Sequence, residues 1–167
     1  EARERLDDAY PVIIHALLAH QEQQQLANSA LPRLITLLEA ICRRSIYLVM
    51  IAENPNATVE LIPMLSASPW IAGELARYPV LLDTFLQQRY RHLPDKLELR
   101  DILRQRLLRV EPSDEEELLS VLRLFKKNQV LAVAASDVLA ERPIMKVSDS
   151  LTYIAEVVLE AALERAF

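Results

Sequence analysis

The chain has 167 residues and a net charge of −5, and 51% of its residues are hydrophobic although only 5% are aromatic. This length fits one compact domain that needs neither disulfides nor metals. The single glycine argues against phosphate-cradling loops and other tight backbone turns. The interleaved charges argue against nucleic-acid binding, which relies on a basic face. Because Leu, Ala, Ile and Val dominate, we predict an all-α fold, an irregular multi-helix bundle of about seven or eight helices, with residues 1–167 forming a single helical domain.

Cysteine usage and the apolar runs indicate the cellular environment. Cys42 is the only cysteine and lies in an apolar helical context, which predicts a buried small hydrophobe and a reducing compartment. Charged residues interrupt every apolar run before the roughly twenty residues that a bilayer span requires. We therefore predict a cytoplasmic location. The chain does not begin with Met, and both ends fall within helical patterns, so we expect a piece of a longer protein.

The first third of the chain predicts two helices. The first covers about 3–26, and Pro11 within it predicts a kink or a break. Asn28 or Ser29 is expected to cap a long second helix over about 30–53.

Short helices follow. One is predicted over about 57–65, with an end made irregular by Pro63. Ser68 precedes Pro69, which is the pattern of an N-cap followed by proline at the first helical position.

Longer helices are predicted in the last third. Pro94-Asp95 opens a helix to about Arg109, and a capping box of Ser113 with Glu116 opens another. That helix, about 114–139, contains a run that is apolar on all sides and is therefore expected to be the most buried. Ser148 or Asp149 is expected to cap the last helix. Its apolar stripe is Leu151, Ile154, Ala155, Val158, Leu159, Ala162 and Leu163, beside an acidic row of Glu156, Glu160 and Glu164.

No residue pattern indicates a reaction centre. His15, His20 and His92 are the only histidines, and no cysteine or carboxylate completes a metal set with them. The dense carboxylate groups are Asp7-Asp8, which lack a phosphate-binding turn, and 114–117, which helix capping explains. We therefore predict no catalytic, cofactor-binding or metal-binding residue in this chain.

Two polar or aromatic groups admit both a structural and a functional interpretation. Lys126, Lys127 and Asn128 are expected on the exposed side of a helix, and the alternative is a contact to an adjoining domain. Trp70 and Tyr78 are expected to pack the short helices together, and the alternative is an interface.

Three long stretches resemble one bacterial family. They are SASPWIAGELARYPVLLDTFL over 66–86, DEEELLSVLRLFKKNQVLAVAASDVL over 114–139 and PIMKVSDSLTYIAEVVL over 143–159. In this order and separation they are similar to the bifunctional glutamine synthetase adenylyltransferase/adenylyl-removing enzyme, in the helical region that precedes its second nucleotidyltransferase domain. The resemblance covers about 38–162 and is weakest before Asn28.

The resemblance implies a function for the longer protein. The family transfers AMP from ATP to a tyrosine of glutamine synthetase and removes it by phosphorolysis, under the control of a nitrogen-signalling protein. Its catalytic motif is a glycine-rich turn with a serine and two aspartates one residue apart, which hold magnesium. This sequence has only Gly73, within a predicted helix, and no Asp-x-Asp. The catalytic domain is therefore expected after residue 167, and this region is expected to be inactive alone and to position the catalytic domains.

Two alternatives from other classes stay open at this stage. One is a helical protein-interaction module unrelated to that enzyme, and the other is a small helical enzyme whose site the sequence does not reveal. A glycine-rich, double-aspartate segment after residue 167 in the parent gene would separate them.

Overall fold

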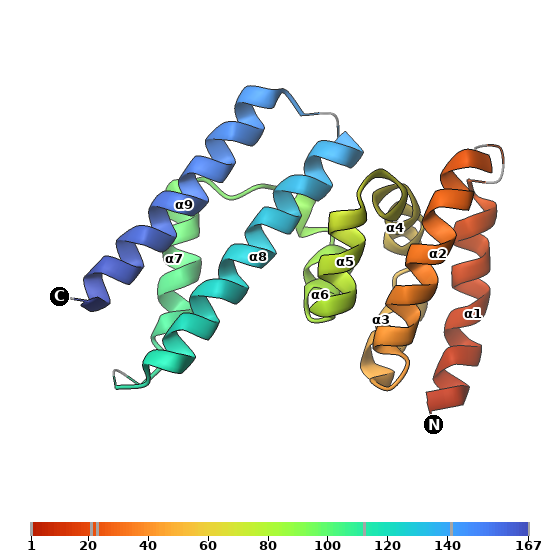
Figure 1. Ribbon diagram of the computed structural model, residues 1–167, viewed down its shortest axis with the longest axis horizontal. Helices are drawn as coiled ribbons and strands as arrows, with labels where there is room; N and C mark the ends of the chain where they lie inside the picture. The colour runs from red at the N-terminus through yellow and green to blue at the C-terminus, as the bar shows by residue number, and fades with distance from the viewer. Residues whose placement is uncertain (1, 21, 23, 112, 141, 167) are drawn as a thin grey trace. The chain divides into compact units, whose positions relative to one another are not determined.

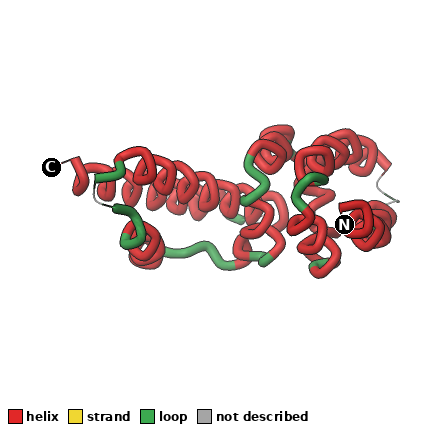
Figure 2. The backbone as a smooth tube through the Cα atoms, turned by 90° about the horizontal axis from the view of Figure 1, so that it is seen from below, coloured by secondary structure: helices red, strands yellow, loops and turns green. Residues whose placement is uncertain are grey.

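The computed structural model describes residues 2–20, 22, 24–111, 113–140 and 142–166. Over these residues all regular secondary structure is helical and no strand is present, as Figure 2 shows. The all-α prediction is confirmed. The described residues form nine α-helices and one short 3₁₀-helix, more than the seven or eight expected.

The chain divides into two compact units, whose helices Figure 1 labels. Unit 1 comprises residues 1–89 and Val138–Ala140, and unit 2 comprises residues 90–137 and 141–167. Whether the two units fold as the single domain expected from the sequence stays a prediction. The helices of unit 1 are α1 (Ala2–Leu18), α2 (Gln24–Ile41), α3 (Ser45–Glu53), α4 (Pro55–Ala67), α5 (Pro69–Arg77) and α6 (Leu81–Leu86). The 3₁₀-helix η1 (Arg89–Arg91) leads to α7 (Lys96–Leu107), α8 (Glu115–Ala140) and α9 (Ile144–Ala166).

The long helix expected over 30–53 is two helices, which accounts for the extra element. The chain turns at 42–44 between α2 and α3, and Arg44 has φ −121° and ψ 87°, outside the helical region. Asn28 and Ser29 lie inside α2, so the predicted cap there is wrong. No proline or glycine marks the turn, and packing sets it, since Ile41, Leu48 and Ile51 are all fully buried.

Prolines interrupt the helices less than expected. Pro11 lies inside α1, Pro32 inside α2 and Pro63 inside α4, and each helix continues past its proline. Of the kink or break predicted at Pro11, the break is therefore wrong, and so is the irregular end predicted at Pro63, whereas a kink at Pro11 stays a prediction. A proline leaves the carbonyl four residues earlier without its helical donor. For Pro63 this carbonyl belongs to Val59, and the His20 Nε2–H donates to it at 3.2 Å.

The cap predicted for the short helix after Ser68 is confirmed, whereas the one predicted at Ser113 is displaced. Ser68 caps α5, its side chain accepting from the Ile71 amide at 3.3 Å, with Pro69 in the first turn. The start of α8 is displaced by one residue from the prediction, since Asp114 rather than Ser113 accepts from the Glu117 amide, at 2.8 Å.

Unit 2 is built from α7, α8 and α9 around a shared apolar core. The buried members of this core are Leu99, Leu103, Leu122, Phe125, Val133, Ile154 and Val157. Most of the apolar run in α8 is buried, with Leu131 only 1% exposed. The expectation that this helix is the most buried is wrong, because its first turns are exposed, whereas α4 buries six of its 13 residues. Arg142 ties the start of α9 to this unit by donating from Nε to Ser136 Oγ and from its other guanidinium nitrogen to the Arg91 carbonyl at 3.0 Å.

Helix α9 differs from its prediction at its start and along its apolar face. It begins at Ile144, so Ser148 and Asp149 lie within it and the predicted caps are wrong. The predicted apolar stripe divides into two parts. Ile154 and the neighbouring Val157 are buried, whereas Leu151, Leu159 and Leu163 are exposed.

None of the described helices combines the length and the apolar composition that a membrane span requires.

Candidate functional site

A groove between α7 and α9 in unit 2 is the best-formed candidate site. A capping box fixes the start of α7, where Asp95 Oδ1 accepts from the Glu98 amide and Glu98 Oε2 accepts from the Asp95 amide, both at 2.9 Å. Two reciprocal hydrogen bonds stabilise this helix end and its geometry. The helix start is therefore rigid where it meets α9.

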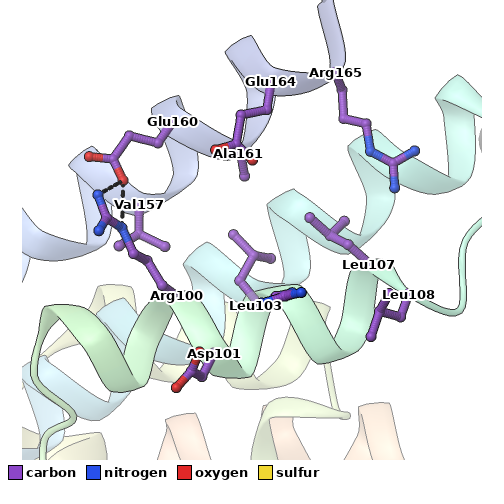
Figure 3. A pocket seen from close by; sticks show the side chains of 11 residues that line it. Arg100, Asp101, Leu103, Leu107, Leu108, Val157, Glu160, Ala161, Glu164 and Arg165 are labelled. Atoms are coloured by element: carbon purple, nitrogen blue, oxygen red, sulfur yellow. Dashed lines mark hydrogen bonds and ion pairs between the residues drawn. The ribbon is translucent and has the colours of Figure 1, made fainter.

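Ion pairs join the two helices at one end of the groove. Lys96 Nζ lies 2.7 Å from Glu156 Oε2 and 3.2 Å from Glu160 Oε1. Arg100 donates from Nε and from a terminal nitrogen to Glu160 Oε2, at 2.8 and 2.6 Å (Figure 3). The hydrogen bond to Glu156, and then that to Glu160, raises the pKa of Lys96, and the hydrogen bond from Arg100 lowers the pKa of Glu160. Lys96 and Glu160 are thus held in their charged forms.

Beyond these ion pairs the groove has an apolar floor and a charged rim. Its volume is about 460 Å³. Leu103 points between the two helices, toward the side of Val157, whereas Asp101 points away from α9 (Figure 3). The lining residues are Arg100, Asp101, Leu103, Arg104, Leu107, Leu108, Val157, Glu160, Ala161, Glu164 and Arg165.

The groove offers charged and apolar side chains for contacts. The lining contains no hydroxyl, thiol or imidazole group, so it offers no nucleophile paired with a base. Glu160 is paired with Arg100 and Lys96 of α7, and Asp101 points away from α9. An apolar floor framed by charges can accept an apolar side chain of a protein segment.

The three histidines lie in separate settings. His15 is exposed on α1, His20 bonds the Val59 carbonyl, and His92 Nε2 lies 3.6 Å from Glu98 Oε2. Within the described part of the chain, no three His, Cys, Asp or Glu residues gather in a way that could hold a metal.

The carboxylate groups singled out in the sequence lie on the surface. Asp7 and Asp8 are exposed on α1, where Asp8 lies 3.8 Å from Arg5. Glu115 and Glu116 are exposed in the first turn of α8, beside the capping Asp114. Their positions fit a structural role at a helix N-terminus.

The expectation of an exposed polar face at 126–128 is only partly correct. Lys126 is exposed and Lys127 half-buried, but Asn128 is 5% exposed and therefore belongs to the interior. Helix α8 is packed on more than one side, so three consecutive residues cannot all face solvent.

The aromatic and cysteine expectations are also revised. Trp70 is 48% exposed, so it contributes only part of its surface to the packing of the short helices. Tyr78 is half-buried, with the Arg77 guanidinium 5.6 Å from its ring centre. Cys42 is half-buried rather than buried, and its thiol donates to the Glu39 carbonyl at 3.2 Å.

Gly73 lies in the middle of α5, as predicted. A Cβ added there would meet no atom within 4 Å, and its φ is not positive. Neither a tight turn nor a close ligand approach therefore requires glycine at this position.

The sequence carries a signal for the groove in two pairs of oppositely charged residues. Lys96 and Arg100 are four residues apart on α7, as are Glu156 and Glu160 on α9. Two such rows of opposite charge pair when the helices lie side by side. The acidic row was identified, but its basic partner was not.

The fold and this groove define a class of protein: an all-α region with an ion-paired groove between two of its helices. Comparison with known proteins gives the family. The family model for glutamate-ammonia ligase adenylyltransferase matches residues 58–167, and the chain belongs to this family.

Curated relatives extend the match to the whole chain. The bifunctional glutamine synthetase adenylyltransferase/adenylyl-removing enzyme of Acinetobacter baylyi is 50% identical over 167 residues, all of this chain and 18% of the relative. The enzymes of the same name from Hahella chejuensis and Pseudomonas syringae pv. tomato are each 42% identical, over 100% and 99% of this chain and 17% and 16% of their own lengths. The resemblance therefore extends beyond the expected 38–162, and the chain spans less than a fifth of these relatives.

Proposed function

We propose that this chain is a helical, non-catalytic region of a bifunctional glutamine synthetase adenylyltransferase/adenylyl-removing enzyme and that it positions the catalytic domains. The observation that carries the proposal is the identity of 40–50% along the whole chain to proteins of that name, of which the chain forms 16–18%. The parent enzyme would use ATP and Mg²⁺ in the cytoplasm. It would act on glutamine synthetase and respond to a nitrogen-signalling protein.

The described side chains support a non-catalytic role. Metal-assisted transfer of AMP needs carboxylates held beside a phosphate-binding turn. Here Gly73 lies within a helix, and the carboxylates of the groove are engaged with Lys96 and Arg100 or lie at its rim. The interhelical ion pairs and apolar faces fit a rigid support.

Isotope transfer tests the proposal. The 167-residue chain and the full-length enzyme are each incubated with Mg²⁺, ATP labelled in its α-phosphate and glutamine synthetase. We expect the full-length enzyme to label glutamine synthetase and the 167-residue chain to leave it at background. Stoichiometric labelling by the short chain would contradict its non-catalytic role, and a full-length enzyme that labels nothing would contradict the activity of the parent.

A further inference from the structure

The outward side of α9 carries an apolar face without a single charged residue. Ile144 is 74% exposed, Leu151 41%, Leu159 62% and Leu163 57%. Ser148, Thr152 and Ala155, which lie between them, are exposed as well. With a rise of about 1.5 Å per residue, this outer face is roughly 28 Å long.

The charges of α9 lie elsewhere on the helix. Its six charged residues are Lys146, Asp149, Glu156, Glu160, Glu164 and Arg165. At about 100° per residue, none falls on the outer face. Glu156 and Glu160 point instead toward α7, where they pair with Lys96 and Arg100. A solvated helix shows the opposite distribution, with charge on its outer side. The outer face is therefore built to be covered.

The spacing along the outer face fits a helical partner. Ile144, Ser148, Leu151, Ala155 and Leu159 are all exposed and follow one another at intervals of four, three, four and four residues. Such intervals keep a row of residues on one side of a helix, where it can lie along a second helix. Ser148 and Ala155 in this row are small, which lets the backbone of a second helix approach closely.

We propose that the outer face of α9 receives an apolar helix from another part of the same polypeptide. This inference rests on the proposed function, because more than four fifths of the length of the curated relatives lies outside the region that this chain matches. A segment tethered in the same chain has an effective concentration of about millimolar, whereas a second copy must meet the face by diffusion. A matching apolar helix within the enzyme therefore covers the face before a separate molecule does.

Site-specific photocross-linking in the full-length enzyme tests this. p-Benzoylphenylalanine replaces Leu159 in one variant and Leu97 in the control. Leu97 is a similarly exposed leucine (67%) on α7, with Asp101 and Arg104 on the same side of that helix. Neither change touches the core of unit 2.

After irradiation in the presence of glutamine synthetase, the products are separated by mass and their peptides are sequenced. We expect the Leu159 variant to give a product of monomer mass, cross-linked to a peptide of the same polypeptide outside this region, in at least tenfold higher yield than the Leu97 control. A product of dimer mass, a product joined to glutamine synthetase, equal yields from both positions, or no product at all would each overturn the proposal.

The cross-linking readout does not depend on enzymatic activity. A cross-link within an enzyme that transfers no AMP would contradict the proposed function alone. Undiminished AMP transfer by a wild-type enzyme whose Leu159 variant gives no cross-link would contradict the docking face alone.

Discussion

At the scale of single residues, one hydrogen bond explains how a proline sits inside a packed helix. Pro63 has no N–H, so the Val59 carbonyl in α4 lacks its usual helical donor. His20, which follows α1, supplies a donor from Nε2 at 3.2 Å. The imidazole therefore carries its proton on Nε2. A histidine that sequence analysis assessed only as a metal ligand compensates for a backbone defect.

A double-mutant cycle tests this compensation. His20→Ala should lower the free energy of unfolding by about 1 kcal/mol, because a partly buried carbonyl loses its partner. With Pro63→Ala, residue 63 regains an N–H that can bond Val59, so His20→Ala should cost less in that background. We expect a coupling of roughly 0.5–1 kcal/mol in urea unfolding.

His15→Ala is the matched control, since His15 is exposed on α1. It should change stability by less than about 0.5 kcal/mol in either background. If His20→Ala lowered the free energy of unfolding equally in the wild type and in Pro63→Ala, the hydrogen bond would not compensate for the missing N–H of Pro63.

At the scale of elements, side-chain caps determine where some helices begin. The cap of α8 lies one residue after the predicted position. The side chain of Asp114 accepts from the amide three residues later, the bond predicted for Ser113. Both residue types are good caps, so the sequence alone does not decide between them.

The cap of α8 can be assigned by substitution. Asp114→Ala should lower the free energy of unfolding by about 1 kcal/mol. Asp114→Asn should keep the free energy of unfolding close to the wild-type value, since Asn caps equally well. Ser113→Ala should leave the urea midpoint nearly unchanged. A larger loss of stability in Ser113→Ala than in Asp114→Ala would show that Ser113 is the cap.

The elements that sequence reasoning missed depend on packing. Ser68 and Asp95 were predictable as helix starts because a cap acts within three residues. The turn at 42–44 was not, because it is set by burying Ile41 and Leu48 on separate helices. The candidate site was missed for a similar reason. Its acidic row was visible on α9, but only the tertiary fold brings Lys96 and Arg100 against it.

At the scale of the whole molecule, function followed from resemblance rather than from composition. Net charge, periodicity and caps led to an all-α chain, and the comparisons confirmed the family. The two compact units could not be predicted, because each unit draws its core from helices distant in sequence. In unit 2, for example, Leu99 of α7 shares a core with Ile154 of α9.

Whether the two units unfold together can be measured with the only tryptophan as a reporter. Trp70 lies in unit 1, while Val133, 3% exposed, belongs to the core of unit 2. Val133→Asp should destabilise the unit 2 core by more than about 3 kcal/mol, because it places an unpaired charge among apolar side chains. Helix α8 runs without interruption from residues of unit 2 into Val138–Ala140 of unit 1, and helix formation is cooperative. For a single domain, we therefore expect the substitution to lower the midpoint temperature of the Trp70 fluorescence transition and that of the circular dichroism at 222 nm by the same amount.

Leu119→Asp serves as the control for this experiment on the same helix, because Leu119 is 47% exposed and its replacement leaves the core intact. It should move neither thermal transition by more than a degree or two. If Val133→Asp removed part of the helical signal while the Trp70 transition stayed at its wild-type temperature, the units would be independent domains. Coincident transitions in the wild type, both lowered by Val133→Asp, would establish one cooperative domain, since two-state unfolding requires that separate probes report the same equilibrium.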